Sequence, residues 1–350
     1  MNVGVIGGGF SGLYYGNLDK DSIIYEEHPY VYFNEHCTGL VTKNVVERLN
    51  PQILNEIYGA KIYMKDINLT IEKKHPAAFV IDRKKLESDL YLKIKDNVLL
   101  NNRIKEIKKN NGKFILKTEN NEYVHDRIII SDGPNSTFRK MVYGYKFKLI
   151  NAIQAEIDYN YVEKEYVSIF LDSKYSQGFF AWAVPRKYDM LVGLATYDKN
   201  VKNKLFKLIN DRFENSKIIK IFGGLIPIGY PKLVEKDHIY LIGDAGYFNK
   251  ATSGGGLYYG ILSAEMAYLS IKNNKNYNKL IDTYKKELFY DYLIHKWYSK
   301  LDDQYKYKFI KKINKKDIIQ YINKIGDIDR PFLLIKNLIF NPKVLTYFIF

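Results

Sequence analysis

A glycine-rich turn directly after the first apolar run is the feature that most constrains the fold of this chain. Residues 3–6, VGVI, have the composition of a buried strand. Three glycines follow this run, namely Gly7, Gly9 and Gly12. Residues 13–18 then begin a predicted helix, and a second predicted strand, residues 22–25, leads to Glu26. Two strands joined through a helix predict a βαβ unit, in which the strands are parallel.

Such a unit binds a dinucleotide in many proteins, and each of its parts has a physical role. The first glycine permits the tight turn, the second lets the backbone approach the pyrophosphate, and the third lets the helix pack on the strand. The phosphates lie at the helix N-terminus, where N–H groups and the helix dipole favour anions. The acid after the second strand, here Glu26, hydrogen-bonds a ribose. The alternative is a glycine-rich turn that binds no ligand.

Two later segments repeat the pattern of a buried strand that ends at an acid and a glycine. In DRIIISDGPNSTFRK, residues 126–140, an isoleucine-rich strand delivers Asp132 and Gly133 into a turn. In IGDAGYFNKATSGGG, residues 242–256, Asp244 follows another apolar run and three consecutive glycines come after it. Glycine costs about 0.5–1 kcal/mol relative to alanine in regular structure. The three glycines therefore indicate that another group approaches the backbone closely.

These three motifs, in this order along the chain, resemble the para-hydroxybenzoate hydroxylase-like superfamily of FAD enzymes. The resemblance implies an FAD cofactor, with Arg83 and Asp132 bracing the dinucleotide and Asp244 contacting the ribityl chain. A helix that begins near Gly255 would supply N–H donors and positive potential beside the flavin, where negative charge develops on reduction. The residues that the resemblance assigns to FAD are Gly7, Gly9, Phe10, Ser11, Gly12, Glu26, Thr38, Gly39, Arg83, Asp132, Gly133, Asp244, Gly254, Gly255, Gly256 and Leu257.

Two further segments resemble motifs of the geranylgeranyl reductases, flavoenzymes that saturate isoprenoid chains, in archaea those of membrane ether lipids. HCTGL, residues 36–40, stands where that family has CxGG, and FAWAVP, residues 180–185, matches its aromatic-x-Trp-x-Phe-Pro motif. The likeness extends over residues 1–265. The residues that the resemblance assigns to the lipid cavity are Phe180, Trp182, Val184 and Pro185.

The chain departs from these family motifs at several positions. Leu40 replaces the second glycine of CxGG, and Val184 replaces phenylalanine. Tyr247, Lys250 and Ala251 stand where the family usually has glycine, asparagine and proline. These departures change the expected geometry of the loop in residues 242–256 and the expected preference for isoprenoid length. They do not change the FAD interpretation.

The expected reaction is the reduction of an isolated alkene, which is not electrophilic. Hydride delivery from reduced FAD is therefore paired with protonation of the other alkene carbon in a slot that excludes water. Cys37 is a candidate proton donor because a thiol in an apolar loop stays protonated. The alternatives are water or a tyrosine as the donor, and a structural role for Cys37 as a small buried hydrophobe. Nothing in the sequence resembles a second dinucleotide site, so an external electron donor is expected, either NADPH or a ferredoxin-type protein.

Other interpretations stay open at this point. Phe180 and Trp182 alternate at strand spacing and would serve equally as ordinary core residues. An FAD-dependent monooxygenase or halogenase of the same superfamily is an alternative function, because residues 180–185 partly match the halogenase motif WxWxIP. Halogenases also need a lysine beside the flavin tunnel, and the sequence does not identify one. A basic membrane-binding or nucleic-acid-binding protein on a vestigial fold is the third class.

Charge and cysteine content indicate the kind of partner and the cellular compartment to expect. Fifty-four Lys and Arg against 39 Asp and Glu give a net charge of +15, which favours anionic partners. Residues 305–316 mix lysines with aromatic side chains, and they predict peripheral contact with an anionic membrane or, more simply, a solvated helix face. A nucleic-acid partner is not expected. One cysteine, no zinc-type cluster and no apolar run of about 18 residues predict a cytoplasmic protein at the inner face of the membrane, without a metal.

The predicted fold is α/β, with a Rossmann-like FAD-binding domain, an antiparallel β-sheet substrate domain and a helical C-terminal region. The antiparallel sheet is predicted from YVSIFL, GFFAWAV and MLVGLA, which are separated by polar turns. The FAD-binding domain is expected to be discontinuous, with residues 1–60, 79–144 and 231–270. The substrate domain is expected in residues 61–78 and 145–230, and the C-terminal region in residues 271–350.

Overall fold

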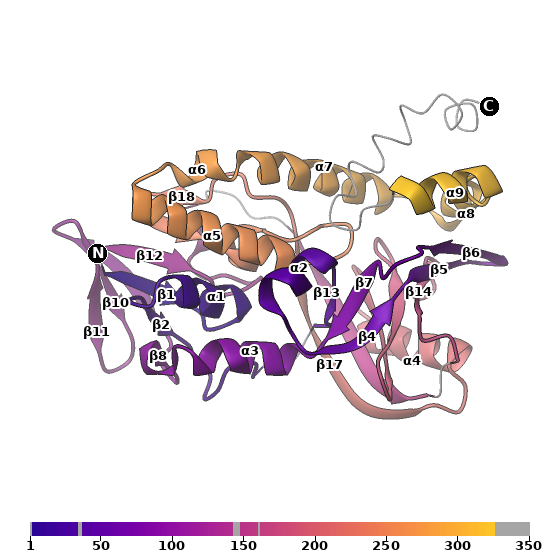
Figure 1. The fold of residues 1–350 in the computed structure, drawn as a ribbon, viewed down its shortest axis with the longest axis horizontal. Helices are drawn as coiled ribbons and strands as arrows, with labels where there is room; N and C mark the ends of the chain where they lie inside the picture. Colours follow the sequence, from indigo (N-terminus) through magenta and orange to yellow (C-terminus); the bar gives the residue numbers. More distant parts are fainter. Residues whose placement is uncertain (1, 34–36, 143–147, 160–161, 326–350) are drawn as a thin grey trace. The chain divides into compact units, whose positions relative to one another are not determined.

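The computed structural model describes residues 2–33, 37–142, 148–159 and 162–325. The chain forms two compact units, and many of their elements are labelled in Figure 1. Unit 1 comprises Met1–Glu35, Arg83–Leu149 and Pro227–Tyr292. Unit 2 comprises His36–Asp82, Ile150–Ile226 and Leu293–Phe350. Two features of the sequence lie outside the described residues, namely His36 of the HCTGL motif and residues 326–350 of the predicted C-terminal region.

A six-stranded sheet forms the centre of unit 1, in the order β18-β19-β12-β1-β2-β8. Its strands are β1 (Val3–Ile6), β2 (Ile23–Tyr25), β8 (Val98–Leu99), β12 (Arg127–Ile130), β18 (Glu235–Lys236) and β19 (Ile239–Leu241). Neighbouring strands run parallel, apart from the antiparallel pair of β18 and β19. The helix α1 (Phe10–Leu18) connects β1 to β2. The predicted βαβ unit is therefore confirmed.

Burial on both faces explains why the central strands of unit 1 are so apolar. All four residues of β1 are buried, and so are the three isoleucines of β12. Such a parallel sheet is covered by helices, and α1 packs against α3 (Arg83–Leu92) and α5 (Leu257–Asn273). Because β1, β2, β12 and β19 are parallel, the turns that follow them meet at one edge of the sheet, which is where open α/β sheets bind ligands.

A three-stranded antiparallel sheet extends unit 1, made of β9 (Glu106–Asn110), β10 (Lys113–Lys117) and β11 (Glu122–His125). His125 is buried, and its two ring nitrogens lie 2.8 Å from the Tyr25 hydroxyl and 2.8 Å from Asn2 Oδ1. Burial lowers the pKa of His125 to about 4. Gly4 leaves space for this ring, because a Cβ there would lie 2.7 Å from it.

A seven-stranded sheet forms the centre of unit 2, in the order β17-β13-β16-β15-β14-β5-β6. Its strands are β5 (Gly59–Met64), β6 (Ile67–Glu72), β13 (Lys148–Asp158), β14 (Tyr166–Phe170), β15 (Ala181–Pro185), β16 (Met190–Thr196) and β17 (Lys217–Ile228). The pairs from β13 through β16 and β15 to β14 are antiparallel, as predicted, while β14 and β5 are parallel. A smaller sheet consists of β3 (Leu40–Val41), β7 (Ala78–Ile81) and β4 (Ile53–Ile57).

The side chains of β15 alternate between two cores. Ala181 and Ala183 belong to the core that includes helix α4 (Val201–Arg212). Trp182 and Val184 belong to the core that includes side chains of the smaller sheet. This alternation is the period of two that a strand requires. It places Trp182 and Val184 on one face, whereas Pro185, the third predicted lipid-cavity residue of β15, is not part of that core.

The boundaries of the two units differ from the predicted domains in several regions, among them residues 227–230 and 271–292, which belong to unit 1. Residues 37–60 and 79–82 belong to unit 2, although the sequence suggested that they are part of the FAD-binding domain. The physical reason is that β3, β4 and β7 pair with one another and pack against the seven-stranded sheet. Further along the chain, the predicted C-terminal region contains α6 (Tyr277–Leu280), α7 (Asp282–Tyr298), α8 (Asp303–Ile313) and α9 (Lys316–Ile325).

The basic, aromatic segment of residues 305–316 lies mainly in α8, and part of it is structural. Helix α8 packs against β5 and β6, and Lys306 is buried there. Lys306 Nζ donates to the Leu171 carbonyl at 3.2 Å, and burial lowers the pKa of Lys306. Four lysines of the segment are exposed, namely Lys308, Lys311, Lys315 and Lys316. In the part of the chain that the structure describes, no helix combines the length and apolarity that a membrane crossing requires.

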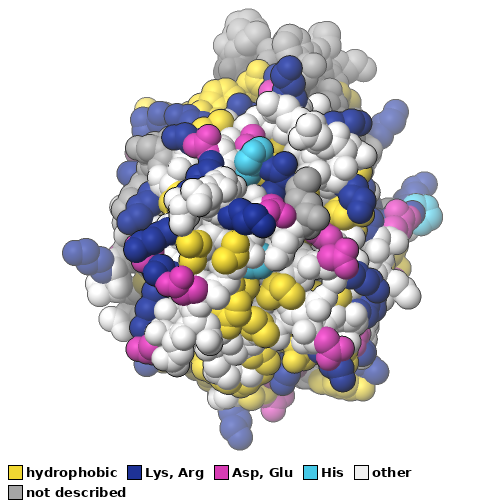
Figure 2. All heavy atoms as spheres, turned by 90° about the vertical axis from the view of Figure 1, so that its left-hand side faces the viewer, with side chains coloured by type: hydrophobic (Ala, Val, Ile, Leu, Met, Phe, Trp, Pro, Cys, Tyr) yellow, Lys and Arg dark blue, Asp and Glu magenta, His cyan; other side chains and the backbone are white. Residues whose placement is uncertain are grey.

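The positive charge of the chain is distributed rather than concentrated on the surface that Figure 2 shows. Lys and Arg side chains are spread over this face, with acidic and apolar side chains between them. A net charge of +15 distributed in this way raises the attraction for any anionic surface without marking a single contact point.

Candidate functional site

The glycine turn after β1 combines close packing with open space. At Gly7, whose φ is +105°, a Cβ would lie less than 3.0 Å from the Ser131 carbonyl, and at Gly12 it would lie equally close to the Gly7 carbonyl. At Gly9, by contrast, no atom of the described residues lies within 4 Å of a Cβ position. Gly9 is also the N-cap of α1, without a side-chain cap hydrogen bond among the residues described. An anion at this helix N-terminus would find backbone N–H donors and empty space.

Glu26 lies beside this turn, at the end of β2. Its side chain is largely buried, and Oε2 accepts a hydrogen bond from the Gly8 N–H at 2.6 Å. Oε1 accepts from the His28 N–H at 2.9 Å and lies 2.5 Å from His28 Nδ1. Since a carboxylate offers about four lone-pair positions, Glu26 keeps acceptor capacity for a ribose hydroxyl. The predicted role of Glu26 therefore fits its position.

The turn after β12 contains a buried polar atom that a ligand would satisfy. Asp132 Oδ2 accepts a hydrogen bond from the Thr137 N–H at 2.9 Å. Asp132 Oδ1 is buried and has no hydrogen-bond partner among the described residues, and burial raises the pKa of Asp132. Beside it, Gly133 has φ of +79°, and no described atom lies within 4 Å of its Cβ position. Buried polar atoms are nearly always bonded, so this turn is consistent with a bound hydroxyl or amide donor.

Arg139 connects the turn after β12 to the turn after β19. The sequence alone assigned no role to this residue. The side chain is buried, and Nε donates to the Ala245 carbonyl at 2.6 Å. One terminal nitrogen donates to the Tyr247 hydroxyl at 2.9 Å and the other to the Pro134 carbonyl at 2.8 Å. The guanidinium also lies 4.2 Å from the centre of the Tyr247 ring. Arg139 ends the run DGPNSTFR, residues 132–139, and its place in the same segment as Asp132 was the available signal.

The turn after β19 meets the first glycine turn at Ser11. At Gly243, which has φ of +55°, a Cβ would lie less than 3.0 Å from Ser11 Oγ, and at Gly260 of α5 it would lie 2.7 Å from the same atom. The Gly243 N–H donates to Ser263 Oγ at 3.0 Å. The structure thus brings the first and the last predicted FAD motifs together, although they are more than 200 residues apart.

The segment of residues 249–256, which we call the glycine loop, precedes α5. The Lys250 N–H donates to the Gly255 carbonyl at 3.0 Å, and the Gly254 N–H donates to the Lys250 carbonyl at 2.8 Å. A Cβ on Gly256 would lie 3.0 Å from Asp244 Oδ1. Helix α5 then begins at Leu257, slightly later than predicted, and within the described chain Gly256 provides no side-chain cap. The loop and the start of the helix present their backbone to any neighbouring ligand.

Arg83 and Phe10 are two further predicted FAD residues that the structure brings together. Arg83 begins α3, is buried and forms an ion pair with Glu87 one turn later. Its guanidinium carbon lies 5.3 Å from the centre of the Phe10 ring, which is within range of a cation–π interaction. Arg83 therefore supports the N-terminus of α1 through Phe10.

The candidate residues of unit 2 are linked by a glutamine that sequence analysis missed. Thr38 Oγ1 donates to Gln154 Oε1 at 3.1 Å, and the Trp182 indole N–H lies 3.4 Å from the same oxygen. Gln154 is buried, and Gly193 leaves room for the indole, because a Cβ there would lie 2.7 Å from it. The Phe180 and Trp182 rings have centroids 6.0 Å apart. An isolated glutamine in β13 carried no signal in the sequence.

The remaining candidates of unit 2 are held by packing and backbone contacts. The Gly39 N–H donates to Cys37 Sγ at 3.4 Å, and Cys37 is half-buried. Gly39 has φ of +76°, and its carbonyl accepts from the Ile81 N–H at 3.0 Å. Val184 is buried, as is Pro185, whose carbonyl accepts from Asn55 Nδ2 at 3.0 Å.

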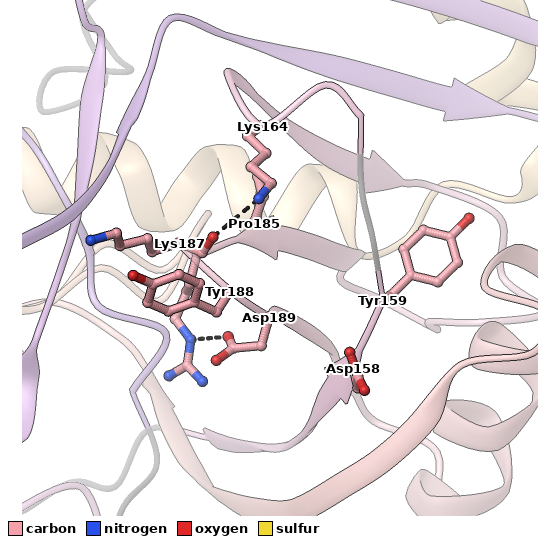
Figure 3. A pocket seen from close by; sticks show the side chains of 8 residues that line it. Asp158, Tyr159, Lys164, Pro185, Lys187, Tyr188 and Asp189 are labelled. Atoms are coloured by element: carbon pink, nitrogen blue, oxygen red, sulfur yellow. Dashed lines mark hydrogen bonds and ion pairs between the residues drawn. The ribbon is translucent and has the colours of Figure 1, made fainter.

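A polar pocket of about 260 Å³ lies at the connection between β15 and β16, and Figure 3 shows its lining. Lys164 donates to the Lys187 carbonyl at 3.0 Å, and Arg186 pairs with Asp189 and with Glu156. Of the predicted residues, Pro185 lines this pocket. Its charged lining does not suit an isoprenoid chain, so we do not assign it to the predicted lipid cavity.

Comparison with known proteins gives relatives along the whole chain, while no family model matches. An uncharacterised protein of Methanocaldococcus jannaschii is 33% identical, over 94% of this chain and 92% of that protein. A digeranylgeranylglycerophospholipid reductase of Methanocella arvoryzae is 30% identical over a shorter region, 30% of this chain and 28% of that enzyme.

Solved structures share the fold of the chain. A geranylgeranyl bacteriochlorophyll reductase-like protein of Thermoplasma acidophilum superposes with a TM-score of 0.80, over 96% of this chain and 98% of that one, at 18% identity. The Klebsiella pneumoniae protein HpxO, whose structure contains FAD and uric acid, superposes with a TM-score of 0.66 at 13% identity, over 93% of this chain and 96% of that one. The predicted α/β fold is confirmed by these comparisons.

Proposed function

The chain belongs to the geranylgeranyl reductase-like family within the para-hydroxybenzoate hydroxylase-like superfamily, and from this premise we propose that it is an FAD-dependent reductase of geranylgeranyl chains. The proposed substrates are precursors of archaeal membrane ether lipids. One observation carries the proposal. Three turns that combine an acid with glycines converge at one edge of the unit 1 sheet.

In this proposal, unit 1 binds the dinucleotide through groups that its fold leaves available. The pyrophosphate would occupy the space beside Gly9, and Glu26 would accept from the adenosine ribose. Asp132 Oδ1 would gain the hydrogen bond that the described residues do not supply. Asp244 would contact the ribityl chain. Residues 255–257 would donate backbone N–H groups to the flavin, while the Gly254 N–H already donates to the Lys250 carbonyl. The buried acid and the open cradle both fit FAD, so the residues present suit the group.

The chemistry divides between the cofactor and the protein. Bound FAD supplies hydride once NADPH or a ferredoxin-type donor has reduced it. The protein binds and orients, and the N-terminus of α5 directs positive potential towards the ligand of the glycine loop. We propose Cys37 as the proton donor to the alkene, because the Gly39 N–H fixes its sulfur.

Unit 2 would hold the isoprenoid chain. Trp182 and Val184 share one face of β15, Phe180 precedes the strand with its ring centroid 6.0 Å from that of Trp182, and Pro185 ends the strand. Gln154 and Gly193 fix the position of the indole. An apolar surface with one fixed aromatic ring can orient an alkene that offers no polar group to bind.

Because the proposed substrate is a lipid, we also propose that the protein is cytoplasmic and makes peripheral contact with the inner face of an anionic membrane. The exposed lysines of residues 308–316 and the net charge of +15 support this contact. The attraction would be electrostatic and therefore sensitive to salt.

The test begins with the purified protein, which should be yellow and release FAD on denaturation. The protein is then reduced with dithionite without oxygen and incubated with digeranylgeranylglyceryl phosphate. Mass spectrometry should show a gain of two hydrogen atoms for each double bond saturated. A colourless protein that takes up no added FAD would overturn the proposal, and oxygen consumption with an oxygenated product would favour the monooxygenase alternative.

A further inference from the structure

Lys250 is a buried lysine within the glycine loop. Its side chain is only 6% exposed, and buried lysines are uncommon because an ammonium group loses its hydration in the interior. A buried ammonium group within a glycine loop therefore needs a physical reason.

The Lys250 side chain lies against the glycines that follow it. Its backbone forms hydrogen bonds to Gly254 and Gly255 at 2.8 and 3.0 Å, which close the loop. A Cβ on Gly255 would lie 3.0 Å from Lys250 Cε and 3.5 Å from Nζ. The ammonium group is therefore adjacent to the backbone that we propose contacts the flavin.

The loop is also anchored by contacts between Thr252 and Asp291 of α7. Asp291 of α7 is 1% exposed and accepts hydrogen bonds from Thr252, at 3.1 Å from the N–H and 2.5 Å from the hydroxyl. Burial raises the pKa of Asp291, and the positive charge of Lys250 opposes that rise. Lys250 thus acts electrostatically on its surroundings, while Thr252 and Asp291 hold the loop in place.

We propose that Lys250 stabilises the reduced, negatively charged form of the flavin, and this inference rests on the proposed function. Oxidised isoalloxazine is neutral, whereas reduction brings negative charge to the ring. A fixed cation in a water-poor site favours the charged form more strongly than it would in water. Lys250 and the N-terminus of α5, which begins at Leu257, would act in the same direction. The consequence is a cofactor that is easier to reduce than it would be with a neutral residue at position 250.

The test compares Lys250→Met, Lys250→Gln and Lys250→Arg with the wild type, with FAD bound. Two quantities are measured, the dissociation constant of oxidised FAD and the midpoint potential of the bound flavin. We expect both neutral variants to bind oxidised FAD as the wild type does. Their affinity for reduced FAD relative to oxidised FAD should fall about tenfold, which corresponds to a potential about 30 mV more negative. Arginine should keep the wild-type potential because it keeps the charge.

Lys306→Met is the matched control. Lys306 is another buried lysine, but it belongs to unit 2 and bonds the Leu171 carbonyl. We expect this variant to lower the melting temperature and to leave the flavin potential unchanged. An unchanged potential in a neutral variant of Lys250, or an equal shift in the Lys306 variant, overturns the inference while FAD binding still supports the proposed function. A wild-type protein that binds no FAD overturns both.

Discussion

The two units present their candidate residues in different ways. In unit 1 the cradle is made of backbone, and at Gly7, Gly12 and Gly243 a Cβ would lie less than 3.0 Å from a neighbouring atom. In unit 2 the candidate face is made of side chains, with Trp182 over Gly193. Backbone positions are fixed by the sheet, whereas side chains depend on rotamers and packing. A substitution at one of these closely packed glycines of unit 1 should therefore alter fold and ligand binding together, while one in unit 2 can alter ligand binding alone.

The largest expected effect is that of Gly12→Ala. The new Cβ would collide with the Gly7 carbonyl, and overpacking against backbone should lower the free energy of unfolding by about 3 kcal/mol. FAD binding should be lost as well. Chemical denaturation and FAD titration measure the two effects.

Gly9→Ala is the matched control for Gly12→Ala. The described residues leave the space around Gly9 open, so the free energy of unfolding should change by less than about 1 kcal/mol. FAD affinity should still fall, because the methyl group enters the space proposed for the pyrophosphate. If Gly9→Ala binds FAD normally, the cradle does not bind FAD in the proposed way.

Acid should weaken both units by a similar mechanism. Burial lowers the pKa of His125 in unit 1 and of His295 in unit 2 to about 4. Between pH 6.5 and 4 the unfolded chain binds a proton at each histidine, whereas the folded protein does not. The free energy of unfolding is therefore highest above the ordinary pKa of 6.5 and falls as the pH drops from 6.5 to 4. Each histidine should lower the free energy of unfolding by up to about 3 kcal/mol over that window.

Urea denaturation at several pH values measures this loss. His125→Gln and His295→Gln should each flatten the pH dependence below 6.5, whatever they do to stability at neutral pH. A pH profile that neither variant changes would show that other groups control acid denaturation.

Trp182→Ala tests the side-chain half of the comparison. If the indole orients the isoprenoid chain, the reduced protein should keep its FAD and most of its melting temperature, yet lose about tenfold in alkene reduction, or about 1.4 kcal/mol of barrier. A core tryptophan behaves differently, since its truncation costs about 3–5 kcal/mol of stability. A large fall in melting temperature with unchanged turnover per folded molecule would make Trp182 structural.

Gln154→Leu should have a smaller effect in the same direction. Thr38 and Trp182 would both lose the shared acceptor Gln154 Oε1, and one hydrogen bond contributes about 1 kcal/mol. Turnover should fall less than in Trp182→Ala, and Gln154→Glu, which keeps an acceptor oxygen at the same position, should restore part of it. Equal turnover in the leucine and glutamate variants would show that the acceptor does not position the indole.

The smallest expected effect concerns the exposed lysines. Lys308→Gln with Lys311→Gln should modestly weaken binding to anionic liposomes, and added salt should remove the difference. Lys306 is excluded from this test because it is buried. Binding that is absent at low salt, or unchanged at high salt, would contradict an electrostatic contact.

The sequence predicted the parts of the fold that depend on local patterns. The βαβ unit followed from an apolar run, a glycine turn and an acid, because these signals lie within about 25 neighbouring residues. The predicted domain of residues 37–60 was different from the observed unit because β3 and β4 pair with β7. The sequence of a short strand carries no signal for a distant pairing partner. The burial of Lys306 was missed for a similar reason, since its acceptor, the Leu171 carbonyl, lies 135 residues away in sequence.

The candidate site was predictable where a motif names its residues. The acid and glycine turns were identified from spacing, and the parallel strands explain why they meet. Gln154 could not be identified in the same way, because a single polar residue in a strand forms no recognisable sequence pattern. The contact of Ser11 with Gly243 was also beyond reach, since only the packing of α1 on α5 creates it.

The strand order of unit 1 has a consequence for the order in which the chain folds during synthesis. β1 pairs with β12 from Val3 opposite Arg127, and β12 pairs with β19 from Ile128 opposite Ile239. β2, the other neighbour of β1, follows it closely in the chain, but β1 leaves the ribosome long before β12 exists. The strands of the unit 2 sheet from β5 to β16 are complete before β19 is made. Contacts of such long range form slowly. The earliest part of the polypeptide must wait, exposed to chaperones and proteases, for a segment made more than a hundred residues later.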